Sequence, residues 1–308
     1  MADWRGRRAL GKDPEQVILN VIRLACAPTI ADPDFGIKLR AIKHAFAERD
    51  FDRVFQTTEN LPIYTAQYIP GRVLCYYQLI TREPAIMAIL RQRPSIFCMG
   101  GGAGSELMAL AAASLNLPTK KMPNSSSSNC AAETSTIPPS PPNPLRPIIC
   151  HTQDYVDWRP VLASLESTAR SVWKIPPEWL QTEFTMGDLL FLDQDLEQRI
   201  GNADLVTAMF VMNELFTLDK QRAMKLVHTI VKALRPGKHL LLVDSAGSFS
   251  HVQIGSNTYM VYTIFDSLRN ALRPVVTHSN VWYRYPLHLR YPLKLDNMQY
   301  YVRLYQKL

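Results

Sequence analysis

The stretch Cys98-Met-Gly-Gly-Gly-Ala-Gly-Ser-Glu106 decides the fold. It follows a short apolar run, Ser95–Met99, which is typical of a buried strand. It opens an Ala- and Leu-rich run, Glu106–Leu117, which predicts a helix. The stretch is therefore the sharp turn of a strand–turn–helix unit.

Glycines in this turn have the spacing GxGxG. Glycine lets a backbone turn sharply and approach a ligand where a Cβ would collide, and the helix beyond offers free N–H groups. A related GxGxxG loop binds dinucleotides, but Ser105 stands at its last position here, which disfavours a nicotinamide cofactor. A tight turn without a ligand is the alternative. The candidate cofactor-binding glycines are Gly100, Gly101, Gly102 and Gly104.

Strands and helices alternate after this unit, which predicts a parallel α/β sheet covered on both faces. A helix over Lys220–Leu234 ends at Arg-Pro-Gly, and two further strands, near Val281–Arg284 and Met298–Tyr305, complete the sheet. The four preceding strands are expected at Ile148–Thr152, Thr182–Thr185, Asp204–Phe210 and His239–Asp244.

Two regions flank or interrupt this pattern. Residues 1–92 read as a helical N-terminal region, with apolar residues at helical spacing over Pro14–Cys26, Phe35–Phe46 and Tyr68–Leu90. Residues 118–147 are rich in Pro and Ser and lack aromatic residues, which predicts a disordered surface insertion. We therefore expect a second domain, residues 93–308, that carries the glycine turn and this insertion.

Composition bounds the function less tightly. Apolar residues make up 47% of 308 residues, so a packed core is feasible. The five cysteines form no CxxC pair and the histidines no metal-ligand spacing, so we expect neither a disulfide scaffold nor a metal site. We expect no signal peptide and no membrane span.

The positive charge of the chain is concentrated near its C-terminal end. Formal net charge is +7, and Arg269–Leu308 holds seven basic residues against one acid. Such a tail suits a polyanionic partner or is an ordinary solvated face.

Acidic residues follow the second and third strands. Asp154 lies 52 residues after Gly102, or 22 once the 30-residue insertion is removed, near the spacing at which a carboxylate binds ribose hydroxyls. Asp157 is the fallback, although a helix N-cap also explains it. Asp188, in a Gly-Asp pair, is a candidate adenine contact, and Leu189 and Phe210 complete the candidate cofactor-binding residues.

The fourth and fifth strands also end in polar residues. Ligands of open α/β sheets bind beyond the carboxyl ends of the strands, so Asn213, Glu214 and Asp244 are the candidate catalytic residues. For Glu214, an ordinary helix start explains the residue equally well.

Taken together, these segments resemble the fungal family of 25S ribosomal RNA uridine-N3 methyltransferases. The resemblance is carried by the glycine stretch, Asp154–Trp158, Ala203–Phe216, Val243–Ser248 and Tyr291–Tyr300. It implies a class I methyltransferase fold, a Rossmann-like parallel sheet with a terminal antiparallel strand, and S-adenosylmethionine (SAM) as methyl donor. Many related enzymes carry an acid where this chain has Cys98, so one contact near the methionine end of SAM is missing from the pattern.

The resemblance also implies ribosomal RNA, or a pre-ribosomal particle, as substrate. It implies an intracellular location in the nucleus, nucleolus or cytoplasm. Uracil N3–H must lose its proton before it is methylated, and Glu214 or Asp244 is the candidate base, with Asn213 orienting the base edge. Trp282, Tyr283, Tyr285 and Tyr291, interleaved with Arg284 and Arg290, are candidates for stacking on RNA and holding phosphate, or are core residues. Small-molecule methylation and a non-catalytic binding module are the competing hypotheses.

Overall fold

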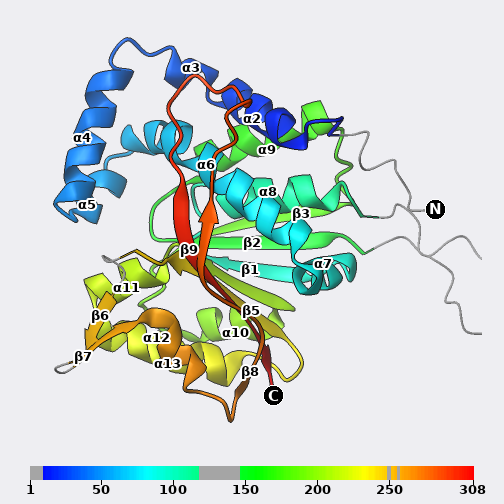
Figure 1. Cartoon of the computed structure of the whole chain (residues 1–308), viewed down its shortest axis with the longest axis vertical. Coiled ribbons are helices and arrows are strands. Elements are labelled where there is room, and N and C mark those ends of the chain that lie inside the picture. The colour runs from blue at the N-terminus through cyan, green and yellow to red at the C-terminus, as the bar shows by residue number, and fades with distance from the viewer. Residues whose placement is uncertain (1–9, 118–145, 248–250, 255–256) are drawn as a thin grey trace, which may run out of the picture.

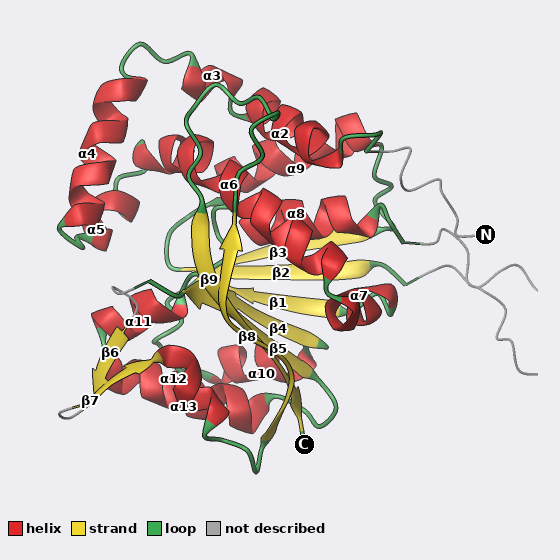
Figure 2. Cartoon of the chain, in the orientation of Figure 1, coloured by secondary structure: helices red, strands yellow, loops and turns green. Residues whose placement is uncertain are grey.

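A seven-stranded sheet forms the centre of the molecule (Figure 2). The computed structural model describes residues 10–117, 146–247, 251–254 and 257–308. The strand order is β3-β2-β1-β4-β5-β9-β8; β1 to β5 are parallel, and β9 runs antiparallel to both of its neighbours. The strands are β1 (Ser95–Met99), β2 (Ile148–Asp154), β3 (Leu180–Met186), β4 (Leu205–Met209), β5 (His239–Ser245), β8 (Leu272–Tyr283) and β9 (Met298–Lys307). This topology confirms the predicted Rossmann-like sheet with a terminal antiparallel strand.

Helices cover both faces of the sheet, as Figure 1 shows. Alternate residues of the parallel strands enter two separate apolar cores: Ile96 and Leu241 face one, Phe97 and Leu242 the other. The first core is shared with α2 (Pro14–Ala25), α6 (Asn60–Arg82), α8 (Ser105–Ser114) and α9 (Arg159–Trp173). The second is shared with α10 (Gln194–Asn202), α11 (Met212–Leu218), α12 (Lys220–Ala233) and α13 (Val261–Asp266).

The N-terminal region is helical, as predicted, and contributes to the first core. Asp13 caps α2, its carboxylate accepting a hydrogen bond from the Gln16 backbone N–H at 3.1 Å. The single helix predicted over Tyr68–Leu90 is wrong, because Pro84 disfavours helical geometry at Glu83, which is extended. The chain instead forms α6 and α7 (Pro84–Arg91). The other helices here are α3 (Ala27–Ile30), α4 (Phe35–Ala47) and α5 (Phe51–Phe55).

The edge strand β8 begins nine residues before the predicted start at Val281. Most of its side chains between Leu272 and Tyr283 are exposed, so the strand has no apolar run to mark it. A short hairpin of β6 (His251–Ile254) and β7 (Asn257–Met260) was also not predicted. Residues 118–145 of the predicted insertion lie outside the described residues.

Within the described residues, the structure shows neither a membrane-spanning helix nor a metal-binding group. No helix there combines the length and the apolar character that crossing a membrane requires. No group of three or more His, Cys, Asp or Glu side chains there is placed to hold a metal ion.

Candidate active site

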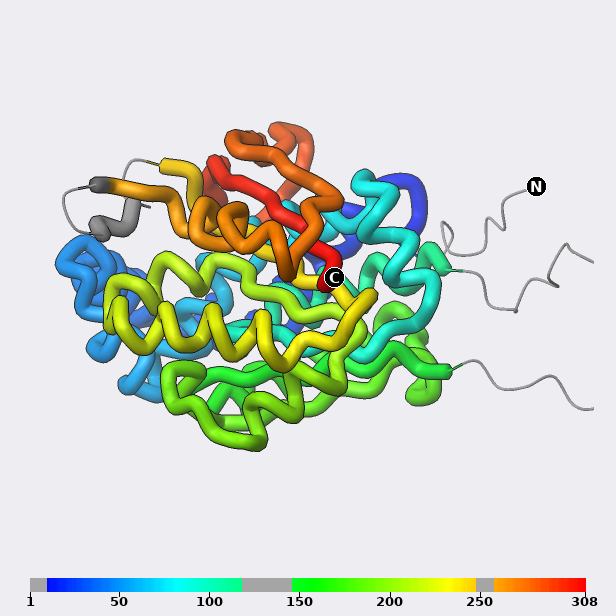
Figure 3. The backbone as a smooth tube through the Cα atoms, turned by 90° about the horizontal axis from the view of Figure 1, so that it is seen from below, coloured from blue at the N-terminus to red at the C-terminus, as the bar shows by residue number. Residues whose placement is uncertain are grey.

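A cavity of about 690 Å³ lies at the carboxyl ends of β1 to β4. Its volume is in the range of small-molecule sites. The loops after these strands form one wall, and α5 and α6 of the N-terminal region form the other. Figure 1 shows this edge of the sheet between α5 and α11, and Figure 3, turned by 90°, shows both helices at the same end of the molecule. Both the sheet and the N-terminal helices therefore build the site.

The glycine turn is held in a conformation that other residues rarely adopt. Gly100 and Gly104 have φ of 70° and 89°, in the left-handed region that favours glycine. Gly100 and Gly101 line the cavity, whereas Gly102 and Gly104 do not. A Cβ at Gly104 would lie 2.8 Å from Leu165 Cδ1, so this glycine permits close packing between the turn and α9.

Gly102 joins the turn to the end of β2. Its backbone N–H donates to Asp154 Oδ2 at 3.1 Å. A Cβ at Gly102 would lie 2.0 Å from Trp158 Cδ1 and 2.6 Å from Asp154 Oδ2. A side chain at residue 102 would therefore displace Asp154 and Trp158, which both line the cavity.

Asp154 lines the cavity, and the fallback residue Asp157 does not. Burial raises the pKa of Asp154, although the Gly102 N–H opposes this effect. Asp157 instead pairs with Arg159, with 2.6 Å between Oδ2 and Nη2, at the start of α9. Of the two carboxylates, Asp154 is the one that can reach a ligand.

Residues after β3 and β4 complete the strand-end wall. Asp188 and Leu189 line the cavity, and Asp188 Oδ1 accepts from the Leu190 N–H at 2.8 Å. Phe210 also lines the cavity and has a φ of 59°, an uncommon value for a bulky residue. Such backbone strain persists where the surroundings hold a residue in place, and it is common at ligand sites.

Of the three catalytic candidates, only Glu214 lines the cavity. Burial raises the pKa of Glu214 to about 8, with the nearby carboxylate of Asp154 adding to the shift and Arg72 opposing it. Asp244 is 3% exposed and accepts hydrogen bonds from the backbone N–H and side-chain amide of Asn213 at 3.0 and 2.8 Å. Asp244 and Asn213 thus lie behind Glu214.

Several cavity residues were missed by the sequence analysis. Arg72, Tyr64 and Tyr76 come from α6, where helical periodicity alone cannot tell a core side chain from a ligand contact. Glu106 is 3% exposed and faces the glycine turn. The signal for Glu106 was a single acid in a helix that is otherwise Ala- and Leu-rich.

The C-terminal aromatic and basic residues lie away from the cavity. None of Trp282, Tyr283, Tyr285, Tyr291, Arg284 and Arg290 lines it. The stacking role considered for Tyr283 is wrong, because this side chain is fully buried. The Tyr291 hydroxyl donates to the Ala66 carbonyl in α6 at 2.9 Å. Trp282 is 49% exposed, with the Arg284 guanidinium 5.4 Å from its ring centre, and these two remain available to a partner.

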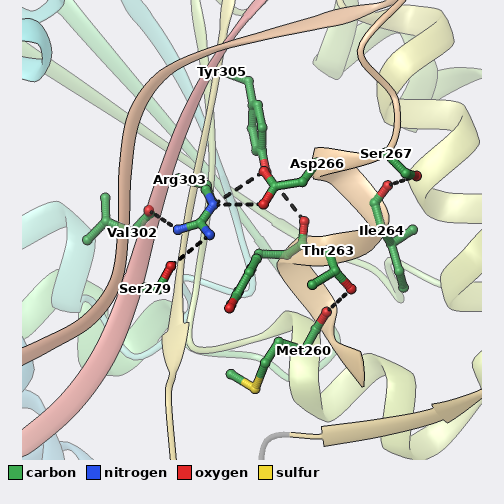
Figure 4. A network of polar contacts seen from close by, with 10 residues as sticks. Met260, Thr263, Ile264, Asp266, Ser267, Ser279, Val302, Arg303 and Tyr305 are labelled. Atoms are coloured by element: carbon green, nitrogen blue, oxygen red, sulfur yellow. Dashed lines mark hydrogen bonds and ion pairs between the residues drawn. The ribbon is translucent and has the colours of Figure 1, made fainter. Parts of the chain in front are cut away.

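The tail is also less basic at its surface than its composition indicates. Arg303 is 4% exposed and pairs with Asp266, with 3.2 Å between Nε and Oδ2 (Figure 4). Asp266 also accepts from the Tyr305 hydroxyl at 2.6 Å, which ties α13 to β9. Arg303 therefore stabilises the fold and adds no free positive charge to the surface.

Comparison with known proteins gives a family match over most of the chain. Residues 22–306 match the family model described as "Putative SAM-dependent methyltransferase". A 25S rRNA (uridine(2843)-N(3))-methyltransferase of Saccharomyces cerevisiae is 28% identical over 289 residues, covering 88% of this chain and 77% of that protein.

Among solved structures, the N-methyltransferase NodS of Bradyrhizobium japonicum, in complex with S-adenosyl-L-homocysteine, has a TM-score of 0.39 at 17% identity. The similarity covers 81% of this chain and 97% of that one. A methyltransferase of Methanosarcina mazei has a TM-score of 0.42 at 12% identity, over 73% and 98% of the two chains. These similarities are weak, so the fold assignment rests on the strand order itself.

Proposed function

The chain belongs to this family of SAM-dependent methyltransferases, and from that premise we propose that it methylates N3 of a uridine in large-subunit ribosomal RNA. The assignment of uridine as the acceptor rests on the similarity to the yeast 25S rRNA uridine-N3 methyltransferase, which extends over 88% of this chain. The shape and chemistry of the cavity support it.

The cavity fits the adenosine part of SAM. Asp154, at the end of β2, would accept hydrogen bonds from the ribose hydroxyls beside Gly100 and Gly101, which also line the cavity. Asp188 and Leu189 would contact adenine. When bound, SAM supplies an electrophilic methyl group for the acceptor. These residues bind and orient it at the strand ends, next to Glu214.

Glu214 is the base that this arrangement favours. The N3–H of uracil must give up its proton so that the nitrogen lone pair is free to form the bond to the methyl carbon. A carboxylate whose pKa is raised to about 8 holds a proton more tightly than an ordinary one, which suits it to accept a proton from a weak acid near neutral pH. Asp244 and Asn213 act as positioning residues, because they fix the first turn of α11, from which Glu214 projects.

Aromatic rings line the cavity beside this carboxylate. Phe55 lies with its ring centre 5.1 Å from that of Tyr64 and 6.2 Å from that of Tyr155. A uridine taken out of its stack needs such rings, because stacking on them offsets the cost of unstacking. We propose that these rings hold the uracil while Glu214 takes its proton.

The substrate would be ribosomal RNA or a pre-ribosomal particle, in the nucleus, nucleolus or cytoplasm. The proposal is tested by mass spectrometry of nucleosides from the large-subunit RNA of a strain that lacks the gene. We expect 3-methyluridine to fall and to return with the wild-type gene but not with Glu214→Gln. An unchanged 3-methyluridine content, or loss of a small methylated metabolite instead, would overturn the RNA assignment.

A further inference from the structure

The methionine end of SAM carries an α-ammonium and an α-carboxylate. A buried charge is costly unless a group of opposite sign and good geometry meets it. A cavity that encloses this end therefore needs an anion and a cation of its own. Asp154 and Asp188 are assigned to the ribose and the adenine, and position 98 is a buried cysteine in this chain, so other residues have to meet these two charges.

Glu106 supplies a carboxyl group at the glycine turn. Burial raises its pKa to about 8, and an ammonium bound beside it would favour the ionised form of Glu106. Its Oε2 lies 2.6 Å from the point where a Cβ at Gly101 would stand, and Cys98 Cβ lies 3.1 Å from the same point. The carboxylate of Glu106 therefore comes close to the position that a longer side chain at residue 98 would reach. Its other oxygen, Oε1, accepts from the Thr207 hydroxyl of β4, which fixes its orientation. Glu106 lines the cavity although it is 3% exposed.

Arg72 supplies the cation from α6. Its guanidinium lies 5.5 Å from the ring centre of Phe210 and 5.7 Å from that of Tyr64, and Nη1 donates to the Tyr64 hydroxyl at 2.6 Å. Among the residues that the structure describes, no carboxylate forms an ion pair with it. Arg72 lines the cavity, where a carboxylate is the partner that best matches a guanidinium.

We propose that Arg72 and Glu106 bind the two charges of the amino-acid end of SAM, Arg72 its carboxylate and Glu106 its ammonium. The N-terminal helical region is then part of the cofactor site, and Glu106 takes the place of an acid at position 98. This assignment is independent of the acceptor.

Calorimetry with two ligands tests the proposal. S-Adenosylhomocysteine has the amino-acid end, and 5′-methylthioadenosine lacks it. Arg72→Met and Glu106→Gln should each weaken S-adenosylhomocysteine roughly 10- to 100-fold, the range of a charge-assisted hydrogen bond, and leave methylthioadenosine within about 2-fold. Arg72→Lys, which keeps the charge, should restore part of the loss. Glu48→Gln, the same change at an exposed carboxylate outside the cavity, should leave both affinities unchanged.

Decarboxylated S-adenosylhomocysteine separates the two charges. The wild-type protein should bind it more weakly than S-adenosylhomocysteine, and Arg72→Met should bind it as well as the wild type does. Equal loss of both ligands in a variant, or no loss of either, would overturn the proposal. Loss of RNA binding with intact S-adenosylhomocysteine binding in Arg72→Met would assign this residue to the acceptor instead. If the variants do not fold, the wild-type protein alone still tests the proposal. Equal affinity of the wild type for methylthioadenosine and S-adenosylhomocysteine would overturn it.

Discussion

Asp244, at the end of β5, accepts two hydrogen bonds from Asn213, one from its backbone N–H at 3.0 Å and one from its side-chain amide at 2.8 Å. It also accepts from the Ser245 N–H at 2.8 Å. The carboxylate thus joins β5 to the first turn of α11, and its favourable interaction with a helix N-terminus adds to these bonds. Glu214, the next residue after Asn213, owes its position at the cavity to this link.

Asp244→Asn should therefore destabilise the fold and slow methyl transfer. We expect a loss of about 1–3 kcal/mol in the free energy of unfolding, measured with urea, because charge-assisted hydrogen bonds at a buried site are weakened. Asp157→Asn, the same change at an exposed carboxylate, should alter stability little. Equal stability of Asp244→Asn and the wild type would contradict the positioning role.

Glu214→Gln should lower kcat by about 10²- to 10⁴-fold, the usual contribution of a general base. In the wild type the rate should rise with pH towards a plateau above about 8, because only the ionised carboxylate accepts a proton. In Glu214→Gln this rise should disappear while affinity for S-adenosylhomocysteine is kept. A pH profile that is the same in both proteins would show that another group titrates.

Two raised carboxyl pKa values predict a stability that falls with pH. Burial raises the pKa of Glu106 and of Glu214 from 4.5 to about 8. The folded protein then binds protons more tightly than the unfolded chain, so the ligand-free protein should lose stability as pH rises from about 4.5 to about 8. Thermal melts across this range check the slope, which should be shallower in Glu106→Gln. The carboxyl of Glu106 faces Cys98, Thr207, Asp154 and Arg72. Burial has a larger effect on its pKa than any of these neighbours.

Gly102→Ala should abolish cofactor binding by moving Asp154 and Trp158, since the new Cβ would lie 2.0 Å from the Trp158 ring. The matched control is Gly36→Ala in α4, where the nearest atom is 3.9 Å away and alanine favours the helix by about 0.5–1 kcal/mol. Thermal shift with S-adenosylhomocysteine measures both variants. Normal ligand binding by Gly102→Ala would mean that the turn relaxes without displacing Asp154.

The exposed part of the basic tail should contribute to RNA affinity. Replacing Arg284 and Arg290 with Ala should flatten the salt dependence of binding to a ribosomal RNA fragment, since each phosphate contact releases counterions. Affinity for S-adenosylhomocysteine should not change, because neither residue lines the cavity. Arg303→Ala, in contrast, should destabilise the protein, because it leaves Asp266 without its cation. An unaltered salt slope would place the RNA surface elsewhere.

The sequence alone determined the sheet and its glycine turn. Continuous apolar runs such as Ser95–Met99 mark strands buried on both faces, and the turn at Gly100 to Gly104 requires a backbone that only glycine adopts easily. The positions of Asp154 and Asp188 followed, because the carboxyl ends of parallel strands meet at one edge. The edge strand β8 escaped prediction, because a strand exposed along most of its length has no apolar signature.

Only the tertiary structure decided which polar residues face the cavity. In the sequence, nothing distinguishes Glu214 from Asn213 and Asp244, since all three lie at or just after the end of a strand. Packing places Glu214 at the cavity, whereas Asn213 and Asp244 bond to each other outside its lining. Arg72 lies 28 residues before Gly100 in a helix whose pattern indicates a core position. Its place in the site depends on the contacts of α6 with the end of β4, where the Tyr76 hydroxyl meets the Met209 carbonyl and Arg72 lies over the Phe210 ring. Local periodicity records which face of an element is buried; long-range packing determines whether that face meets apolar core or a ligand.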